Sequence, residues 1–318
     1  MSVLVTGGAG FIGSNLIDRL ARQGREVVGL DNFNDYYDPR IKRANAARLE
    51  TLGATVAEGD FCDLERTEAL FRERKLDMVV HLGARAGVRP SLEQPLLYEK
   101  VNCQGTLNLL ELARRHGVPK FVFASSSSVY GNNTKVPFSE DDPVGRPISP
   151  YAATKRAGEL LCHTYYHLYG IETVCLRFFT VYGPWGRPDM AIYKFTDAIE
   201  NGRPIAMYGD GTTQRDYTFI EDILDGVTAA MERTLGYEIV NLGESKVIEL
   251  RRLIETIEDA LGKKAQIERR PMQPGDVEKT YADIAKARRL LDYNPQYPVS
   301  KGVPAFVEWY REMRSRLR

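Results

Sequence analysis

The chain has 318 residues, of which 43% are hydrophobic and 27% are charged, proportions that are ordinary for a soluble globular protein. Its 43 basic residues are balanced by 43 acidic residues, which argues against a nucleic-acid-binding protein, because phosphate neutralisation needs a net basic surface. No apolar run reaches the roughly 20 residues that cross a bilayer, so no membrane partner is expected.

The first half of the chain alternates short apolar runs with helical patterns, which is typical of a parallel sheet covered on both faces. Strands are expected at residues 2–6, 27–30, 55–58, 78–82, 121–124 and 172–178. Helices are expected at residues 11–23, 40–52, 64–73, 101–116 and 151–169. These six or seven βα units predict an α/β fold with a Rossmann-like, doubly wound parallel sheet.

The pattern changes after about Thr180, where four Gly and Pro residues within 183–188 mark an irregular loop. Residues 238–242 have the pattern of one more strand that returns to the sheet. A second Pro/Gly loop, at 271–276, lies between short helical segments. The sequence therefore predicts a Rossmann-like domain over residues 1–180, with the return strand near 238–242, and a smaller C-terminal α/β substrate-binding domain over residues 181–318.

The four cysteines stand far apart and form neither a CxxC pair nor a zinc-ligand spacing, so we expect reduced thiols and no bound metal. The N-terminus enters a strand at once and has no basic segment followed by an apolar core, the pattern of a secretion signal. A cytoplasmic location is therefore expected. The cysteines are Cys62, Cys103, Cys162 and Cys175.

A glycine loop follows the first predicted strand and opens the first helix. Gly7, Gly10 and Gly13 have the spacing GxxGxxG. Glycine permits the tight turn and lets the backbone approach a ligand closely, while the N-terminus of the helix faces a pyrophosphate. At this position the loop predicts a dinucleotide site.

Acidic residues end the next two strands. Asp31 follows Gly13 by 18 residues, where a carboxylate accepts hydrogen bonds from the adenosine ribose hydroxyls. It would repel a 2′-phosphate, so NAD is favoured over NADP. Asp60 and Phe61, at the end of the third strand, are suited to hold the adenine. For Asp60 a loop-capping interaction is the alternative.

The second predicted helix, which comes after Asp31, carries three cations: Arg40, Lys42 and Arg43. Because cations could bind a 2′-phosphate, they weaken the preference of the site for NAD over NADP. A solvated helix face is the other interpretation of these residues, and the sequence favours it.

Tyr151 and Lys155 are four residues apart, which places them one turn apart on the same face of a helix. There the ammonium can lower the pKa of the phenol by stabilising the phenolate, which turns a weak acid into a usable base. A serine hydroxyl near the same substrate oxygen would complete a proton-transfer triad, and the serine run 125–128 lies upstream.

Several motifs together resemble the extended short-chain dehydrogenase/reductases, and more closely the nucleotide-sugar 4-epimerases. They are the glycine loop, His81-Leu82-Gly83-Ala84, the serine run followed by Val129-Tyr130-Gly131, Tyr151 with Lys155, and Arg215-Asp216-Tyr217. Segments 31–37, 86–89 and 177–190 resemble the UDP-glucuronate 4-epimerases of bacteria and plants in particular. The resemblance covers essentially the whole chain.

The resemblance implies an NAD that is reduced and reoxidised within each turnover, with a 4-keto sugar as the transient intermediate. Tyr151 as phenolate would take the proton of the sugar 4-hydroxyl, and Lys155 would lower the pKa of Tyr151 and bind the nicotinamide ribose. Ser126 would bridge Tyr151 and the substrate oxygen, although Ser125 and Ser127 remain alternatives. The implied cofactor site extends to Phe11, Ile12, Asn32, Asn34, Leu82 and Ala84.

The residues after Ser126 separate the related reactions. The 4,6-dehydratases have Asp-Glu at this point, and the UDP-glucuronate decarboxylases have Glu at the second position, whereas this chain has Ser127 and Ser128. Without carboxylates neither reaction is well served, so epimerisation is favoured. Ser127 and Ser128 are then expected to contact the substrate.

The substrate is expected to be UDP-glucuronate, converted into UDP-galacturonate. Thr180 stands where galactose-type 4-epimerases commonly have Asn, and Arg187 offers a bidentate fork for a uronate carboxylate. For Arg187 an ion pair at the surface or at a dimer interface is the alternative. Two other functions remain: a UDP-glucose/UDP-galactose 4-epimerase, and a non-catalytic dinucleotide-sensing protein, which would typically lack the Tyr/Lys pair.

The resemblance also implies that Arg215 binds the diphosphate and Asp276 the uridine ribose. Arg89 could serve the diphosphate, with helix capping as an equal alternative. Arg85 departs from the family pattern, because a neutral residue is usual there, and it adds a positive charge near the cofactor.

A homodimer is expected, because the family usually associates through two helices of each subunit. The candidate segments here are 107–112 and 160–169. The apolar stripes on them fit either a dimer interface or packing against the sheet. They include Leu109, Ala113, Leu161 and Tyr165.

Overall fold

The computed structural model describes residues 1–271 and 279–316 and contains two compact units. Each unit is assembled from separate stretches of the chain. The first consists of Met1–Asn133, Glu140–Phe178 and Val227–Asn241. The second consists of Thr134–Ser139, Phe179–Gly226 and the stretch that begins at Leu242. None of the helices in the described residues is long and apolar enough to cross a membrane.

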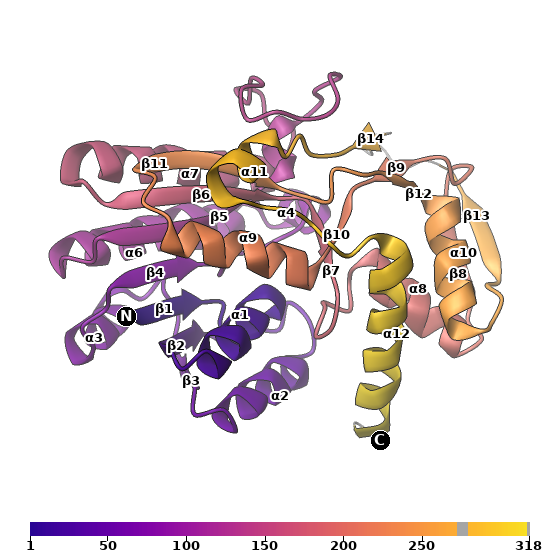
Figure 1. The fold of residues 1–318 in the computed structure, drawn as a ribbon, viewed down its shortest axis with the longest axis horizontal. Helices are drawn as coiled ribbons and strands as arrows, with labels where there is room; N and C mark the ends of the chain where they lie inside the picture. Colours follow the sequence, from indigo (N-terminus) through magenta and orange to yellow (C-terminus); the bar gives the residue numbers. More distant parts are fainter. Residues whose placement is uncertain (272–278, 317–318) are drawn as a thin grey trace. The chain divides into compact units, whose positions relative to one another are not determined.

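A seven-stranded sheet forms the centre of the first unit, in the order β11-β6-β5-β4-β1-β2-β3 (Figure 1). Every strand pair from β3 to β6 is parallel. The strand order reverses between β1 and β4, and ligands of such sheets bind beyond the carboxyl ends of the strands at this point. The doubly wound fold expected from the sequence is therefore confirmed. The strands are β1 (Ser2–Thr6), β2 (Glu26–Asp31), β3 (Thr55–Glu58), β4 (Met78–His81), β5 (Lys120–Ser126), β6 (Glu172–Phe178) and β11 (Tyr237–Leu242).

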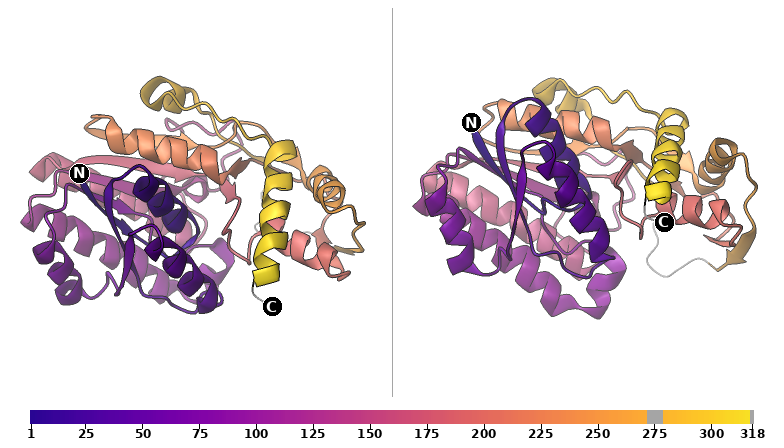
Figure 2. Two further views of the ribbon diagram at one scale, coloured as in Figure 1. Left: turned by 60° about the horizontal axis from the view of Figure 1, so that its bottom comes forward. Right: turned by 90° about the horizontal axis from the view of Figure 1, so that it is seen from below.

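Helices cover both faces of this sheet (Figure 2). Because the crossovers between parallel strands are right-handed, the reversal of strand order sends the helices of the two halves to opposite faces. The first two helices cover one face, and the next three long helices cover the other. They are α1 (Phe11–Arg22), α2 (Pro39–Glu50), α3 (Leu64–Glu73), α6 (Gly105–Arg115) and α7 (Pro150–Tyr169).

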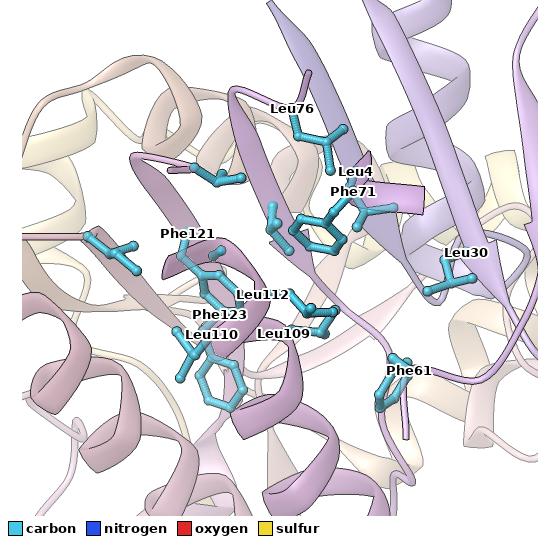
Figure 3. Close-up of a cluster of buried hydrophobic side chains, with 14 of the residues drawn as sticks. Leu4, Leu30, Phe61, Phe71, Leu76, Leu109, Leu110, Leu112, Phe121 and Phe123 are labelled. Atoms are coloured by element: carbon cyan, nitrogen blue, oxygen red, sulfur yellow. The ribbon is translucent and has the colours of Figure 1, made fainter. Parts of the chain in front are cut away.

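The apolar core of the second of these faces is drawn in Figure 3. Leu4 on β1 and Phe121 on β5 pack there against Leu109 and Leu112 of α6, and all four side chains are fully buried. Burial of a side chain of this size stabilises the fold by about 1.5–3 kcal/mol. The cluster fixes the strands whose ends carry the predicted site.

The chain between β4 and α6 differs from the predicted helix 101–116. It forms α4 (Val88–Glu93), α5 (Pro95–Glu99) and a π-helical turn at Lys100–Gln104 before α6 begins. Proline at the first position of α5 is compatible with a helix start, because no amide hydrogen bond is lost there. The apolar periodicity of so short a stretch was too weak to predict these turns.

The strand predicted at 55–58 matches β3, which ends at Glu58. Asp60 and Phe61, which were expected at its end, come after it. Asp60 lies in the turn that follows, where its carboxylate accepts the amide hydrogen of Cys62 at 2.8 Å. Asp and Asn favour such turns because the side chain replaces a backbone acceptor.

In the described residues, the second unit contains three small sheets and several helices. The helices on either side of the loop predicted at 271–276 have 12 and 7 residues, in agreement with the short segments expected there. The sheets pair β10 with β7, β12 with β9 and β14, and β13 with β8. The strands are β7 (Thr180–Tyr182), β8 (Ile205–Tyr208), β9 (Gln214–Arg215), β10 (Tyr217–Phe219), β12 (Ile248–Glu249), β13 (Ile267–Arg270) and β14 (Lys279–Thr280). The helices are α8 (Ala191–Glu200), α10 (Leu250–Leu261), α11 (Ala285–Leu291) and α12 (Val299–Arg316), while α9 (Ile220–Glu232) begins in this unit and ends in the first.

Candidate functional site

The glycine loop packs too closely on the sheet for any other residue. Gly7 has a φ of +67°, and a Cβ atom there would lie 2.9 Å from the backbone of Gly83. A Cβ on Gly13 would lie 2.1 Å from the carbonyl oxygen of Gly7. α1 starts immediately after Gly10, which gives it no side-chain cap, so its first amides point out of the loop without a competing side chain. This cradle fits a pyrophosphate.

A buried hydrogen-bond chain supports the loop from below. The hydroxyl of Thr6 accepts the amide hydrogen of Gly83 at 3.1 Å and lies 2.7 Å from Nδ1 of His81. Nε2 of His81 lies 3.0 Å from the hydroxyl of Thr106, which donates its own hydrogen to the carbonyl oxygen of Asn102 at 2.6 Å. Nε2 therefore carries the ring hydrogen, and Nδ1 accepts the hydrogen of Thr6. Burial holds the pKa of His81 well below its ordinary value, so the ring is neutral. His81 therefore ties β4 to β1 and does not act as a proton carrier.

Asp31 lies at the end of β2, as predicted, and is buried beside the glycine loop. Its carboxylate accepts the amide hydrogens of Ala9 at 3.2 Å and Phe33 at 2.9 Å. The first contact joins the loop to β2, and the second closes the turn in which Phe33 has a positive φ. The carboxylate is thus fixed beside the loop, where a ribose would lie.

The predicted residues Asn32, Asn34 and Asp60 form one cluster at this edge. The amide of Asn32 donates to Oδ2 of Asp60 at 3.1 Å, and the amide of Asn34 donates to Oδ1 of Asn32 at 2.6 Å. Burial alone would raise the pKa of Asp60, but the hydrogen bonds from Cys62 and Asn32 outweigh it and leave the pKa lowered.

The ring of Phe61 lies in the core, packed edge-on against His81 with ring centroids 5.2 Å apart. Its side chain is therefore part of the apolar core of the first unit. The same ring restricts position 83 to glycine, because a Cβ there would lie 2.7 Å from the ring.

The interpretation of Lys42 as part of a solvated helix face is wrong. Its ammonium is buried, with Nζ 3.5 Å from Oδ1 of Asp31. Burial lowers the pKa of Lys42, and the charge of Asp31 opposes that change. Arg40 and Arg43 are exposed. Arg40 pairs with Asp38, and Arg43 pairs with Glu58. The sequence could not separate the three, because only packing decides which side of α2 meets β2.

Arg85 follows β4 and is held by its backbone. Its amide donates to Oδ1 of Asn102 at 2.8 Å, and its carbonyl accepts from Nδ2 of the same residue at 3.0 Å. The guanidinium lies over the ring of Tyr36, 5.8 Å from the centroid, where a cation is attracted to the aromatic face. Leu82 and Ala84 lie on the same segment and are partly buried.

Asn102 was not predicted as a site residue. It lies in the π-helical turn, is almost fully buried, and also donates to the hydroxyl of Thr154 on α7 at 3.0 Å. It therefore links the loop after β4 to the helix of Tyr151 and Lys155. A single Asn on the apolar side of a predicted helix is the signal that could have found it.

The local sequence fixes where α7 begins. The hydroxyl of Ser149 caps the helix by accepting the amide hydrogen of Ala152 at 3.1 Å, and Pro150 occupies the first helical position. Tyr151 therefore lies in the first turn, where the positive end of the helix dipole favours a phenolate. Tyr98 packs edge-on against the ring of Tyr151 at 6.2 Å and was a second residue that the sequence did not single out.

Lys155 lies one turn further along α7 and is almost fully buried. Its ammonium donates to the carbonyl oxygen of Ala124 on β5 at 2.7 Å and lies 5.1 Å from the ring centroid of Phe123. Burial lowers the pKa of the ammonium to about 8. The group is still protonated at neutral pH, but only narrowly.

The serine run divides between the strand and the turn that follows it. Ser125 points toward α7, where its hydroxyl donates to Oε1 of Glu159 at 2.6 Å. Ser126 points to the other side, as alternation along a strand requires, and its Oγ accepts the amide hydrogen of Ser128 at 3.2 Å. Ser127 and Ser128 are partly exposed in the turn Ser127–Tyr130. This alternation favours Ser126 over Ser125 for substrate contact.

In the second unit, Arg187 lies in the loop between β7 and α8. It binds the carboxylate of Asp189 with both Nε, at 2.9 Å, and Nη2, at 2.5 Å. The loop is anchored by Trp185, whose ring lies 5.5 Å from that of Trp309 on α12. Thr180 begins β7 and is partly exposed.

Arg215 ends β9 and is followed by Asp216, a buried residue that organises the segment. The carboxylate of Asp216 accepts amide hydrogens from Glu244 at 2.8 Å, Ser245 at 3.0 Å and Ala282 at 3.1 Å. Two distant segments of the chain, at Glu244–Ser245 and at Ala282, are thereby held to the residue that follows Arg215. Arg89 is exposed on α4, and the predicted uridine ligand Asp276 lies outside the described residues.

Comparisons with known proteins agree with this geometry. A model of the NAD dependent epimerase/dehydratase family matches residues 3–243. UDP-glucuronate 4-epimerase from Thermodesulfobacterium geofontis is 45% identical over 97% of this chain and 96% of its own length.

Two solved structures have the same fold over the whole chain. One is UDP-glucuronic acid 4-epimerase from Bacillus cereus in complex with UDP-glucuronic acid and NAD, with a TM-score of 0.91, 36% identity, and coverage of 98% of this chain and 100% of that chain. The other is UDP-glucose 4-epimerase from Thermotoga maritima with UDP-glucose, with a TM-score of 0.91, 32% identity, and coverage of 99% and 100%. The chain belongs to the NAD dependent epimerase/dehydratase family and is an NAD-dependent nucleotide-sugar 4-epimerase.

Proposed function

We propose that this enzyme interconverts UDP-glucuronate and UDP-galacturonate. The observation that carries the proposal is Arg187, whose fork already binds a carboxylate, that of Asp189, through two donors. A buried carboxylate without such a partner is costly, so a uronate needs a cation of this kind. The uronate carboxylate would join or replace Asp189, with the hydroxyl of Thr180 as a further donor. The similarity to UDP-glucuronate 4-epimerases supports the same substrate.

We propose that the first unit binds the cofactor and that residues of the second bind the nucleotide sugar. Bound NAD would supply the hydride acceptor and donor for the sugar C4. The glycine loop would hold its pyrophosphate, and Asp31 would accept hydrogen bonds from its adenosine ribose and repel a 2′-phosphate, with Lys42 fixing the position of that carboxylate. Arg215 and Arg89 are proposed for the substrate diphosphate, and Asp276 for the uridine ribose.

Tyr151 is proposed as the base that takes the proton of the 4-hydroxyl and later returns it. Its place in the first turn of α7 and the ammonium of Lys155, one turn away, would both stabilise the phenolate. Ser126 would hold the substrate oxygen beside Tyr151. Ser127 and Ser128 would contact the sugar without offering the carboxylate that an elimination needs. The 4-keto sugar would then present its other face before the hydride returns.

The enzyme is proposed to work as a cytoplasmic homodimer. The stripe residues named from the sequence do not serve this purpose, because Leu109 and Ala113 are fully buried and Leu161 and Tyr165 pack against the same core. Other apolar side chains on the two helices are exposed and could pair with a second subunit. They are Leu107, Leu160, Leu168 and Tyr169.

The substrate is tested by product analysis of the purified enzyme with UDP-glucuronate and, separately, with UDP-galactose, without added reductant. We expect epimerisation of the uronate. The Arg187→Ala variant should raise KM for the uronate roughly 10- to 100-fold, because a hydrogen bond to a charged group contributes about 1.5–3 kcal/mol. Arg203→Ala, which removes an exposed Arg–Asp pair of the same unit, is the matched control and should leave KM unchanged.

Turnover of the neutral sugar alone would overturn the uronate assignment and leave Arg187 with a structural function in its loop. A pentose product would show decarboxylation and would contradict the interpretation of Ser127 and Ser128.

A further inference from the structure

A pair of opposite charges lies buried behind the serines of β5. Glu159 on α7 is 0% exposed and Arg177 on β6 is 1% exposed, and no step of the proposed mechanism uses either residue. The guanidinium binds the carboxylate through Nε at 2.8 Å and Nη2 at 3.0 Å. The cost of desolvation makes a buried ion pair a poor source of stability. The burial of Glu159 and Arg177 at this place therefore needs an explanation other than stability.

The carboxylate of Glu159 joins three elements of the first unit. It accepts the hydroxyl hydrogen of Ser125 on β5 at 2.6 Å and two hydrogen bonds from Arg177 on β6, and Ser125 and Arg177 are direct partners in the strand register. Arg156 on α7 donates to the same carboxylate at 2.8 Å. Glu159 thus fastens α7 to β5 at the residue that precedes Ser126.

Glu159 also lies one helical turn beyond Lys155 and two beyond Tyr151. The hydrogen bond from Lys155 to the carbonyl oxygen of Ala124 is the neighbouring tie between the same two elements. Two adjacent ties fix both the distance of α7 from β5 and its position along the strand. A shift of α7 would move Tyr151 relative to Ser126.

A second arm of the network reaches the serine turn. Nη1 of Arg177 donates to the hydroxyl of Tyr130 at 3.0 Å, and this hydroxyl donates to Oδ1 of Asn241 on β11 at 2.7 Å. Tyr130 ends the turn that carries Ser127 and Ser128. The same guanidinium therefore supports the turn on one side and the helix on the other.

We propose that Glu159, with Arg177 as its fixed counter-ion, is a positioning residue that sets the register of α7 against β5 and so the distance between Ser126 and the Tyr151–Lys155 pair. This inference rests on the proposed catalytic assignment of those three residues. Reactions that depend on oriented groups lose about 100-fold in rate for a displacement near 1 Å. The network should therefore act on the chemical step and leave ligand binding intact.

The test is the double variant Glu159→Gln/Arg177→Met, which removes both charges so that neither is left buried alone. We expect it to fold and to bind NAD and UDP with unchanged Kd. Its kcat for UDP-glucuronate should fall roughly 10- to 100-fold at unchanged KM, the range for a displaced reacting group. Ser125→Ala, which removes one hydrogen bond of the same carboxylate, should lower kcat in the same direction by a smaller factor.

The matched control is Lys120→Met/Glu172→Gln. This pair lies on the same two strands at their opposite end, with Nζ and Oε1 3.4 Å apart and both side chains mostly buried. It should change stability in a similar way and leave kcat unchanged. A double variant at Glu159 and Arg177 that keeps kcat within about twofold of the wild type, or a control with the same loss of kcat, would overturn the positioning proposal.

Failure of the proposed function has a different signature. Tyr151→Phe should abolish turnover while NAD remains bound. If Tyr151→Phe stays active, the catalytic assignment itself is wrong, whereas an inactive Tyr151→Phe beside a fully active double variant removes the positioning inference alone.

Discussion

At the scale of single residues, the site depends on side chains whose environment matters more than their identity. Lys155 is one of 43 lysines and arginines in this chain, but its position on α7 buries it against β5 and brings its pKa to about 8. Ser125 and Ser126 are chemically identical neighbours. Because side chains alternate along a strand, the hydroxyl of Ser125 faces Glu159, whereas that of Ser126 faces the opposite side and accepts from the turn at Ser128. The two serines therefore have different partners.

The low pKa of Lys155 predicts how activity depends on pH. Because burial lowers this pKa, the ammonium form of Lys155 is present below about pH 8 and is lost as the pH rises through that value. The proposed mechanism needs the ammonium to stabilise the Tyr151 phenolate, so kcat/KM should fall above about pH 8. The profile of kcat/KM reports groups of the free enzyme and is the measurement to make.

Lys155→Arg is the matched variant for this profile, because an arginine stays charged throughout the accessible range. It should be less active at neutral pH, since the longer side chain does not fit the buried site, but its kcat/KM should lose the alkaline decline. A wild-type profile that stays flat well above pH 8 would show that the protonation state of Lys155 does not limit the reaction.

At the scale of elements, α7 begins where it does because of three local signals that the sequence displays. They are a capping serine, Ser149, a proline at the first helical position and, at the far end, Gly170 with a φ of +70°. The helix was predicted from its periodicity to within one residue. By contrast, the short helices and the π-helical turn between β4 and α6 were not predicted. Asn102 in that turn is held by hydrogen bonds to Arg85 and Thr154, two residues that are distant in the sequence.

Removal of the cap should affect both stability and catalysis. Ser149→Ala deletes the acceptor for the amide hydrogen of Ala152, which should lower the free energy of unfolding by about 1 kcal/mol. Because Tyr151 lies in the uncapped turn, we also expect a severalfold loss of kcat. Urea denaturation and steady-state kinetics measure the two effects. Ser149→Thr retains a capping hydroxyl and should restore both, and a Thr variant as impaired as Ala would contradict this explanation.

At the scale of the whole molecule, the chain passes between its two units several times. The short segment Thr134–Ser139 belongs to the second unit, where the backbone of Phe138 donates to Tyr281 and accepts from Asp283 in an isolated β-bridge. The end of α9 and β11 belong to the first. Besides the expected return strand near 238–242, segment 134–139 is a crossing that the sequence did not predict, because this segment has no periodicity that indicates its partner.

The proposed homodimer gives a prediction at this scale. Leu160 is 53% exposed and Leu168 is 59% exposed on α7. A dimer interface that covered these apolar side chains would be stabilised by their burial. Analytical ultracentrifugation should give twice the 35.9 kDa mass of the chain for the wild type, and Leu160→Glu should give largely the single-chain mass. Leu96→Glu, at an apolar side chain exposed on α5, is the control and should sediment like the wild type. A monomeric wild type would refute the proposal.

The sequence by itself determined the alternation of strands and helices along the first 180 residues, the glycine loop, the acidic residue at the end of β2 and the Tyr151–Lys155 pair. These features depend on local rules, namely periodicity, capping, the conformational freedom of glycine and the spacing of one helical turn. Only the tertiary structure decided that Lys42 is buried beside Asp31, that Asn102 links two elements of the site, and that Glu159 and Arg177 form a buried pair behind the serines. Each of these depends on which distant segments pack together, and burial and charge pairing act between such segments without leaving a pattern along the chain.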